Sequence, residues 1–424
     1  MSTSTATPRP LGSLATQVAN EPGIDAIAGQ RDSVLAVPEV ARAAVLAALI
    51  NNTTRRPIVI ATPTGTMAQS IAEDLASFLG SDAIEFFPSW ETLPFERVSP
   101  AVLTMGSRMR TMWRMRQGKN APSVIVAGTR ALLQKLAPGS TTLEPIHIAV
   151  GSTLNIDALC EQLVHCGYRR ETIVEHRGEF ARRGAIVDIF PSTDDEPIRV
   201  DMWGDDVERL THFTVADQRS TDEITSVEIF PARELLYVDG VQDRARELIA
   251  TEPWGREQWE RLSEGQIFDG MESWLPWLTE SPTLLSDILP RGSKMLLIEP
   301  RRMRDRAADL LAEEADLARA LASSWARDAE RDFPRLYSPP DRLLSETRGS
   351  WNLIPVADGP DMPLMEASGW GAMGGSGEGI AERMRTLLSQ GYRIVVAADG
   401  EGSAQRLSEI FSNAGLQLDI YHEL

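Results

Sequence analysis

PIVIATPTGTMAQSIAEDLASFL, residues 57–79, is the stretch that decides the fold class. Its first five residues form an unbroken apolar run, which is typical of a strand buried on both faces. A turn with Pro63 and Gly65 comes next, and the spacing of apolar residues after it predicts a helix from about 67 to 79. A buried strand followed by a tight turn and a helix is half of a βαβ unit. The stretch therefore predicts a parallel sheet covered by helices.

The same alternation continues on both sides of this stretch and defines a first domain over residues 1–150. Apolar runs of strand length alternate with segments of helical spacing. We expect helices at 35–50, 101–116 and 129–136, and strands at 83–87, 123–127 and 146–150. Short buried strands separated by helices indicate an α/β domain whose sheet is covered on both faces.

The pattern changes near Gly151, and an α+β insert is predicted over residues 151–235. A helix at 154–166 ends at Gly167, a residue type that favours the helix-stopping conformation. The strands expected after it, with no helix between them, are 172–176, 185–190, 198–203, 207–215 and 226–230. Apolar and polar side chains alternate in 198–203. This alternation predicts an antiparallel sheet with one packed face and one partly open face.

Two further segments follow the insert. Residues 236–348 are predicted to be mostly helical, with one strand-like run at 294–298. In residues 349–424 we expect a glycine-rich linker or mobile loop and then a small α/β unit. Its parts are the loop 368–379, helices ending near 389 and 414, and strands at 393–398 and 417–421. The expected fold class is α/β, with an inserted α+β domain, a helical return segment and a small carboxy-terminal α/β domain.

Composition and charge exclude several function classes. The 424 residues carry 42 Lys and Arg against 61 Asp and Glu, a net charge of −19. A chain with this net charge is not expected to bind DNA nonspecifically over its whole surface, because nonspecific duplex binding needs cations that neutralise phosphates. The two cysteines, Cys160 and Cys166, have no second ligand pair at zinc spacing, so no metal site is expected. With no apolar run of signal-peptide or membrane-spanning length, we expect a cytoplasmic protein without membrane contact.

The turn after residues 57–61 lies where a nucleotide-binding fold would place its phosphate loop. A working loop needs two glycines separated by four residues, followed by Lys and a hydroxyl residue. The residues at these four positions are Ala61, Thr66, Met67 and Ala68. Because a thioether carries no charge to offset a triphosphate, we expect a degenerate loop that does not function. No catalytic residue, metal ligand or cofactor is predicted for this chain, which is expected not to be an enzyme.

Two arginine-rich features stand out against the acidic background. In the first, basic residues on the helix at 101–116 and just beyond it are interleaved with methionines. These residues are Arg108, Arg110, Arg114, Arg116 and Lys119. In one interpretation the helix buries its Met and Trp stripe against the sheet while the arginines stay in solvent. In the other interpretation the helix contacts DNA phosphates or docks onto another domain.

The second feature lies at the edges of the insert, at Arg169 and Arg170 and again at Arg182 and Arg183. Each pair is close to an aromatic residue. Arginine beside an aromatic residue on a partly open sheet is typical of protein interfaces. Because glutamates alternate with these arginines, a solvated edge is an equally good interpretation. Residue types alone leave both interpretations open.

Four motifs, in order along the chain, resemble the family that contains the excision-repair protein UvrB and the transcription-repair coupling factor Mfd. They are FFPSWETLPFE (86–96), SVIVAGTRALLQKL (123–136), GEFARRGAIVDIFP (178–191) and RVDMWGDDVERLTHFTVADQRS (199–220). The resemblance covers residues 30–235 well and continues more loosely through the helical segment. Unlike UvrB, the chain has only about ten residues between Trp90 and the next expected helix. That distance leaves no room for the long DNA-threading hairpin of UvrB.

This resemblance implies a domain organisation. Residues 1–150 would form domain 1A, a degenerate RecA-like parallel-sheet domain. The insert 151–235 would be domain 2, and the helical segment 236–348 would be domain 1B. Residues 349–424 would be a linker and the small domain 3.

The resemblance also implies a function. In this family domain 2 binds the repair protein UvrA and so brings excision repair to a stalled RNA polymerase. By motif position the expected UvrA contacts are Arg169, Arg182, Arg183 and Phe190. The chain is expected to be a fragment of an ATP-dependent DNA translocase whose further domains contact RNA polymerase and DNA. The alternatives are a UvrB-like DNA clamp that uses the helix with Arg108 and Lys119, and an ATP-binding enzyme domain.

Overall fold

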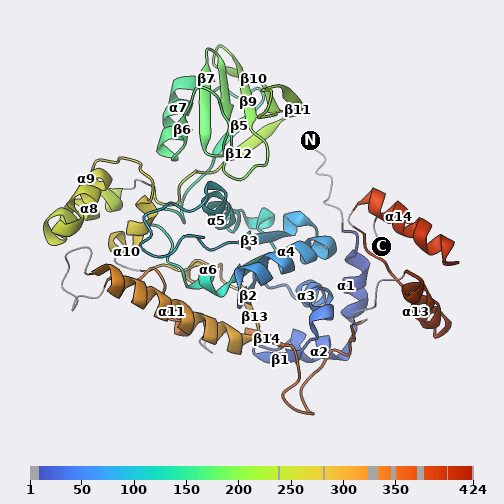
Figure 1. Ribbon diagram of the computed structural model, residues 1–424. Coiled ribbons are helices and arrows are strands. Elements are labelled where there is room, and N and C mark those ends of the chain that lie inside the picture. The colour runs from blue at the N-terminus through green and yellow to red at the C-terminus, as the bar shows by residue number, and fades with distance from the viewer. Residues whose placement is uncertain are drawn as a thin grey trace.

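A parallel sheet forms the centre of the larger body of the molecule (Figure 1). The structure is a computed structural model that describes residues 9–236, 239–279, 282–322, 333–344, 350–369, 377–398 and 400–422. The six strands of this sheet run parallel in the order β1-β14-β13-β2-β4-β3. They are β1 (Ser33–Ala36), β14 (Ser350–Ile354), β13 (Lys294–Ile298), β2 (Ile58–Thr62), β4 (Val124–Gly128) and β3 (Ile84–Phe87). The predicted parallel sheet is confirmed.

Helices cover both faces of this sheet, as the unbroken apolar strands predicted. Alternate residues of β2 belong to two different cores: Ile58 and Ile60 to one, Val59 and Ala61 to the other. The first core is closed by α1 (Gly12–Val18), α2 (Pro22–Ala28), α3 (Arg42–Asn51) and α4 (Gly65–Leu79). The second is closed by α5 (Val102–Arg114), α6 (Thr129–Leu133), α8 (Asp239–Thr251), α9 (Arg256–Ser263), α10 (Leu275–Leu278) and α11 (Pro300–Ala322).

The inserted domain stands above α5, apart from the rest of the body (Figure 1). Its sheet has the order β11-β10-β9-β8-β7-β6. The strands are β6 (Arg169–Arg170), β7 (Glu179–Arg183), β8 (Ile186–Ile189), β9 (Ile198–Trp203), β10 (Asp206–Phe213) and β11 (Ser220–Ile224). The helix α7 (Ile156–His165) closes the core on one side of this sheet. A two-stranded antiparallel ribbon of β5 (Ile146–Ala149) and β12 (Ser226–Ile229) joins the insert to the body.

Several sequence predictions for strands are wrong. Residues 35 and 36 belong to β1 and not to a helix, because the helical spacing begins only at α3. The run 146–150 pairs with β12 outside the parallel sheet, so the insert begins before Gly151. No strand forms at 172–176, whereas β6, β7 and β11, rich in charged residues, were not predicted. For β6, β7 and β11 the pairing partner, and not the local composition, decides whether a strand forms.

The carboxy-terminal region also differs from expectation. The strand β14, at the start of the predicted small domain, belongs to the central sheet between β1 and β13. The expected helices are present as α13 (Gly377–Ser389) and α14 (Glu401–Asn413), and a short α12 (Asp341–Leu344) precedes them. Residues 393–398 and 417–421 form no strand. Of the expected linker at 368–379, residues 370–376 lie outside the described part of the chain. No helix within the described ranges is long and apolar enough to cross a membrane.

Candidate protein-interaction surface of the inserted domain

The sheet of the inserted domain has a packed face and a second, more open face. In β9, Ile198, Val200 and Met202 are buried in the core beneath α7. The alternate residues Arg199 and Asp201 point to the other face, as the sequence pattern predicted. That open face carries a small apolar cluster and a set of arginine–carboxylate pairs. We call it the open face of the inserted domain.

A buried carboxylate organises the centre of the open face. Asp188 of β8 is fully buried, and its two oxygens accept hydrogen bonds from Arg199 Nε at 2.7 Å and Nη2 at 3.0 Å. These bonds raise the pKa of the Arg199 guanidinium, which also lies 4.8 Å above the ring of Phe213. Arg183 Nη2 reaches the same carboxylate at 2.5 Å, yet its side chain remains 47% exposed. Asp188 therefore holds Arg183 in place while solvent, or a partner, can reach it.

Arg169 is held at the edge of the sheet in a similar way. It lies on the edge strand β6, with a side chain that is 65% exposed, and its Nη2 lies 3.1 Å from Glu179 Oε1. The Glu179 carboxylate is buried and also accepts the backbone N–H groups of Glu175 and His176. Because Glu179 and Arg183 are four residues apart on β7, they lie on the same side of the sheet. Arg169 and Arg183 thus share the open face.

Arg182 lies on the opposite side of the sheet from Arg183. Its guanidinium pairs with Asp157 in the first turn of α7. The two adjacent arginines, which the sequence suggested as one cluster, cannot contact one flat partner surface together. This separation follows from the two-residue period of a strand.

Phe190 packs beneath the open face, and little of its side chain is exposed. Its side chain is only 7% exposed and packs with Val174, Ala181 and Phe213. The Arg177 guanidinium lies 5.2 Å from the ring centroid and covers it. The expectation that Phe190 contacts a partner directly is therefore not supported by its burial. Its alternation with Asp188 along the strand was the signal that it faces the small core.

Trp203 is an exposed aromatic residue that the sequence analysis did not select. It ends β9, immediately before the turn at Gly204, where φ is +63°, and 78% of its surface is exposed. Next to it on the open face, Asp201 pairs with Arg209 of β10 at 2.9 Å. The pattern of 198–203 contained the signal, because Trp203 occupies a position of the polar face. A tryptophan on the polar side of an alternating strand is a candidate contact.

Comparison with known proteins identifies the family. The model of the UvrB interaction domain family matches residues 146–235. A transcription-repair-coupling factor of Mycobacterium tuberculosis is 33% identical over 411 residues, which cover 90% of this chain and 33% of that protein. Those of Myxococcus xanthus and Bacillus subtilis are 31% and 29% identical over 70% and 68% of this chain. The chain is related to the transcription-repair-coupling factors. It spans about a third of the length of the curated relatives it matches.

The matched domain coincides with a structural unit of this transcription-repair-coupling-factor relative. Residues 146–235 begin at β5 and end just after β12, the two strands of the connecting ribbon. The sequence resemblance to the UvrB-homology region is thereby confirmed. The ribbon also explains why the match starts at 146, five residues before the predicted boundary at 151.

The arginines on α5 and just beyond it, offered above as possible DNA contacts, pair with acidic side chains of the same chain. Arg108 is fully buried, with Nε 2.7 Å from Glu234 Oε2, so no surface is left for a phosphate. Arg110 and Arg114 both reach the buried Glu85, at 3.4 Å and 2.7 Å. Arg116 pairs with Glu144 at 2.7 Å. The buried methionines of α5 agree with the interpretation that its stripe packs into the core.

The residues at the phosphate-loop position of the UvrB-homology fold make contacts within the chain. The Thr64 hydroxyl accepts the N–H of Met67 and caps α4. Met67 Sδ accepts a hydrogen bond from Arg42 at 3.7 Å, and Arg42 is in turn paired with Glu299 at 2.9 Å. A Cβ placed on Gly128 would lie 2.7 Å from the backbone nitrogen of Gly65. The turn is therefore packed tightly against the end of β4.

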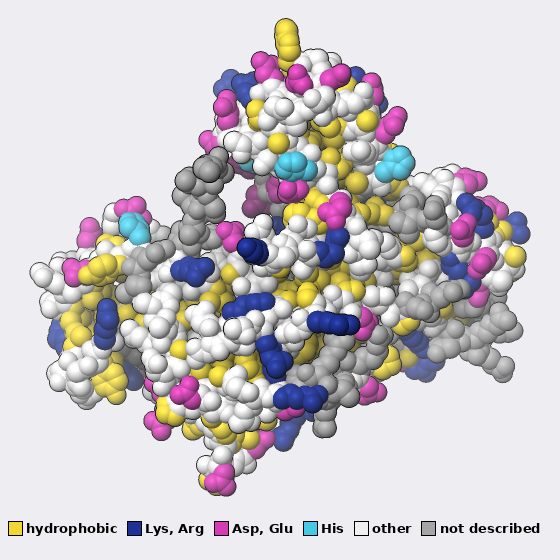
Figure 2. All heavy atoms as spheres, turned by 180° about the vertical axis from the view of Figure 1, so that it is seen from behind, with side chains coloured by type: hydrophobic (Ala, Val, Ile, Leu, Met, Phe, Trp, Pro, Cys, Tyr) yellow, Lys and Arg dark blue, Asp and Glu magenta, His cyan; other side chains and the backbone are white. Residues whose placement is uncertain are grey.

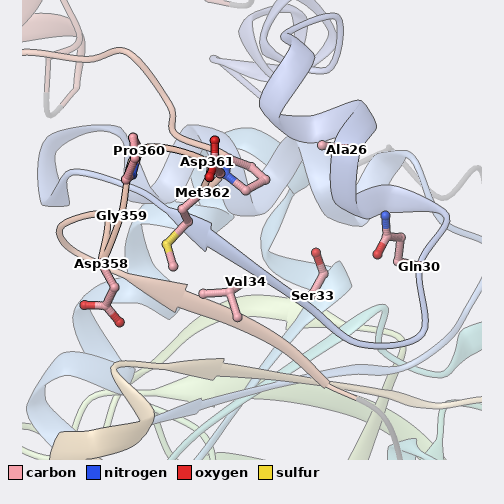
Figure 3. A pocket seen from close by; sticks show the side chains of 10 residues that line it. Ala26, Gln30, Ser33, Val34, Asp358, Gly359, Pro360, Asp361 and Met362 are labelled. Atoms are coloured by element: carbon pink, nitrogen blue, oxygen red, sulfur yellow. The ribbon is translucent and has the colours of Figure 1, made fainter.

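Two other features of the described residues bear on cofactor binding. Among the described residues, no three His, Cys, Asp or Glu side chains come together as a metal site requires. A cavity of about 570 Å³ opens beside β1, between α2 and the loop 358–363 (Figure 3). Its polar side chains do not converge: Gln30 and Asp358 lie on opposite sides of it (Figure 3), and Asp358 pairs with Arg301 at 3.2 Å.

Proposed function

We propose that this chain is a non-catalytic recruitment module of transcription-coupled repair, which binds UvrA through the inserted domain. The observation that carries the proposal is the match of residues 146–235, a unit with its own core, to the UvrB interaction domain. Binding of UvrA would bring the excision machinery to a stalled RNA polymerase. Contacts with RNA polymerase and DNA, and ATP-driven translocation, would belong to the further length of the relatives, because the chain spans about a third of them.

The open face of the inserted domain is the surface that we assign to UvrA. Arg169 and Arg183 are both exposed and both held by buried carboxylates, so little side-chain entropy is lost when they bind. Arginine and tryptophan are the residue types that most often dominate interface energies, and Trp203 stands on the same face. Figure 2 shows acidic side chains spread over the upper surface of this domain, with basic ones at its flanks.

The experiment compares the two faces of one strand. We expect Arg169→Ala with Arg183→Ala to weaken UvrA binding by about 30-fold or more, measured by biolayer interferometry. Arg182→Ala is the matched control, because Arg182 neighbours Arg183 in sequence and lies on the α7 side of the sheet. Alanine is preferred to glutamate, since a new carboxylate would lie beside the buried Asp188 and Glu179.

The binding measurements on these variants show which face of the inserted sheet contacts UvrA. Loss in the double variant and normal binding by Arg182→Ala support the open face. Loss in Arg182→Ala alone would place UvrA on the side of α7. If wild-type protein does not bind UvrA in the first place, the recruitment function itself is wrong for this chain.

A further inference from the structure

One edge of the central parallel sheet borders a cavity. The strand β1 is the outermost strand of this sheet and has β14 on its inner side. The cavity of about 570 Å³ opens along its outer side, and that volume is within the range of small ligand sites. Figure 3 shows Val34 of β1 between the loop 358–362 and the helix that carries Ala26. The edge of β1 is therefore reachable from solvent through this cavity.

The backbone of β1 directs every second residue toward the cavity side. The N–H of Val37 donates to β14 at 2.8 Å, so the odd-numbered residues pair within the sheet. Ala36 points the opposite way: its N–H donates to the Pro363 carbonyl at 2.9 Å, and its own carbonyl accepts the N–H of Met365 at 2.9 Å. Because the backbone groups of an extended strand alternate in direction, the N–H and C=O of Val34 also point outward.

The segment that pairs with Ala36 cannot continue along the strand to Val34. A parallel neighbour would supply its next N–H from position 363, and Pro363 has none. The chain also turns away there, because the N–H of Met362 donates to the Gly359 carbonyl at 3.3 Å. Within the described residues no hydrogen bond reaches the backbone of Val34, and the residue is 36% exposed. An unpaired strand edge is a template for another extended chain.

The charges around the cavity favour a cationic segment. Asp358 and Asp361 line it, and no Lys or Arg does. Asp358 pairs with Arg301 at 3.2 Å, and Arg31, beside the cavity in sequence, lies 3.8 Å from Asp32. Asp361 is exposed and makes no ion pair among the described residues. A lysine or arginine that enters the cavity therefore has Asp361 available.

We propose that an extended, lysine- or arginine-containing segment of a partner protein adds to β1 at this edge. One carbonyl of the segment accepts the N–H of Val34 and one N–H donates to its C=O, as the segment 363–365 does for Ala36. A cationic side chain pairs with Asp361, and apolar side chains contact Val34 and Met362. Strand addition of this kind obtains affinity from main-chain hydrogen bonds and specificity from side chains. The site lies outside the inserted domain and does not depend on UvrA binding.

The cavity also selects the form of the partner. Residues of α2 form one wall and the loop 358–363 forms the other, with β1 between them. A single extended chain fits such a groove, whereas the edge of a second folded sheet would meet the two walls. We therefore assign the site to a peptide segment and not to a second copy of this chain.

The test is titration calorimetry of the whole chain with the peptide acetyl-Val-Lys-Val-Lys-Val-amide. The same peptide with glutamate in place of lysine should bind at least tenfold more weakly. Two further forms carry N-methyl groups, one on both lysine amides and one on the three valine amides. Because a strand donates to one neighbour from alternate residues only, we expect one form to lose about tenfold in affinity and the other to lose little. Equal binding by both forms, or equal loss in both, would overturn the proposal.

Variants of the protein test the same two contacts. Val34→Pro removes the outward N–H and leaves the bonds to β14, and proline is tolerated at such an edge position. It should weaken binding about tenfold, whereas Val34→Ala, which keeps the N–H, should change it little. Asp361→Asn should weaken binding about threefold. Asp305→Asn is the matched control, because Asp305 is an exposed acid on α11 that does not line the cavity.

The peptide forms keep the test valid if a protein variant unfolds, since they leave the protein unchanged. Absence of heat with the lysine peptide at millimolar concentration would show that the edge takes no such segment. Tighter binding of the glutamate peptide would contradict the assigned charge. Sedimentation velocity addresses the other occupant: self-association of wild-type protein that Val34→Pro abolishes would assign the edge to a second copy and reject the peptide.

Discussion

Arg108 and Glu234 are charged residues that nevertheless lie in the interior of the protein. Both side chains are fully buried, and Glu234 also accepts the indole N–H of Trp90 at 2.7 Å. The position of Arg108 could have been deduced, because it is three residues after Met105 and four before Met112, on the buried stripe of α5. Its partner could not, because Glu234 is 126 residues away. Sequence spacing identifies the buried face of a helix, but it does not identify what lies opposite.

Glu314 carries a prediction about pH. It lies on α11, accepts the N–H of Leu336, and leaves its Oε2 buried without a partner. Burial raises its pKa from 4.5 to about 7. The folded state therefore retains this proton to a higher pH than the unfolded state, and the stabilisation it gives is lost as pH rises from about 4.5 to 7. Glu314→Gln should raise the free energy of unfolding by up to about 3 kcal/mol at pH 8 and have little effect at pH 4.

Urea unfolding of both proteins at the two pH values checks this expectation. Groups that do not interact with Glu314 titrate equally in wild type and variant, so their contribution cancels in the difference between the proteins. An equal gain at both pH values would show that the carboxylate is already neutralised by its neighbours, Lys135 and Arg335.

At the scale of elements, sequence prediction was accurate for segments whose own pattern of apolar residues shows which side chains are buried. The strand β9 begins and ends where the alternation at 198–203 predicted. The helix α5 and the strands β2 and β4 agree within one or two residues. By contrast, β7 contains Glu179, Arg182 and Arg183, and these charged side chains pair with residues of other elements. The same pairs explain why the faces of Arg182 and Arg183 could not be assigned from residue types.

The contact between α5 and the inserted domain carries a second prediction. A Cβ on Gly106 would lie 2.4 Å from Ser192 Oγ and 2.7 Å from Ser192 Cβ, so the helix approaches the insert through a glycine. Gly106→Ala should destabilise the protein by about 1–3 kcal/mol through overpacking. Removing the opposing side chain with Ser192→Gly should recover part of this loss in the double variant. Thermal unfolding of the single and double variants measures both effects.

The control is a helical glycine in open space. Gly402 of α14 has no atom near its added Cβ, so Gly402→Ala should be neutral or slightly stabilising. If Gly106→Ala behaves like Gly402→Ala, the inserted domain is free to move away from α5.

For the whole molecule, the order of elements along the chain is not their order in space. The chain builds β1 to β4, leaves to form the inserted domain, and returns to place β13 and β14 between β1 and β2. At the return, Arg233 pairs with the buried Glu272 at 3.1 Å, while Glu234 pairs with Arg108. The run 294–298 was recognised as a strand, but nothing in its sequence specifies its neighbours. Such strand pairing joins segments far apart in sequence, and the local spacing of apolar residues does not indicate which strands will be neighbours.

The degenerate phosphate loop predicts that the whole chain does not bind ATP. We expect no heat of binding when wild-type protein is titrated with Mg·ATP. Met67→Lys should not restore binding, because the new ammonium would lie beside Arg42, which already contacts this position and pairs with Glu299.

The strictest test replaces all four residues at which this turn departs from the pattern of a working phosphate loop. Ala61→Gly, Thr66→Gly, Met67→Lys and Ala68→Ser together supply the residues that a working loop requires. The backbone at Gly65 would still be packed against Gly128 on one side, and Arg42 would still lie beside position 67. We therefore expect the fourfold variant to remain without measurable ATP affinity. Micromolar binding by the wild type would show that the loop opens in solution, and binding by the fourfold variant alone would show that residue identity, not packing, closes the site.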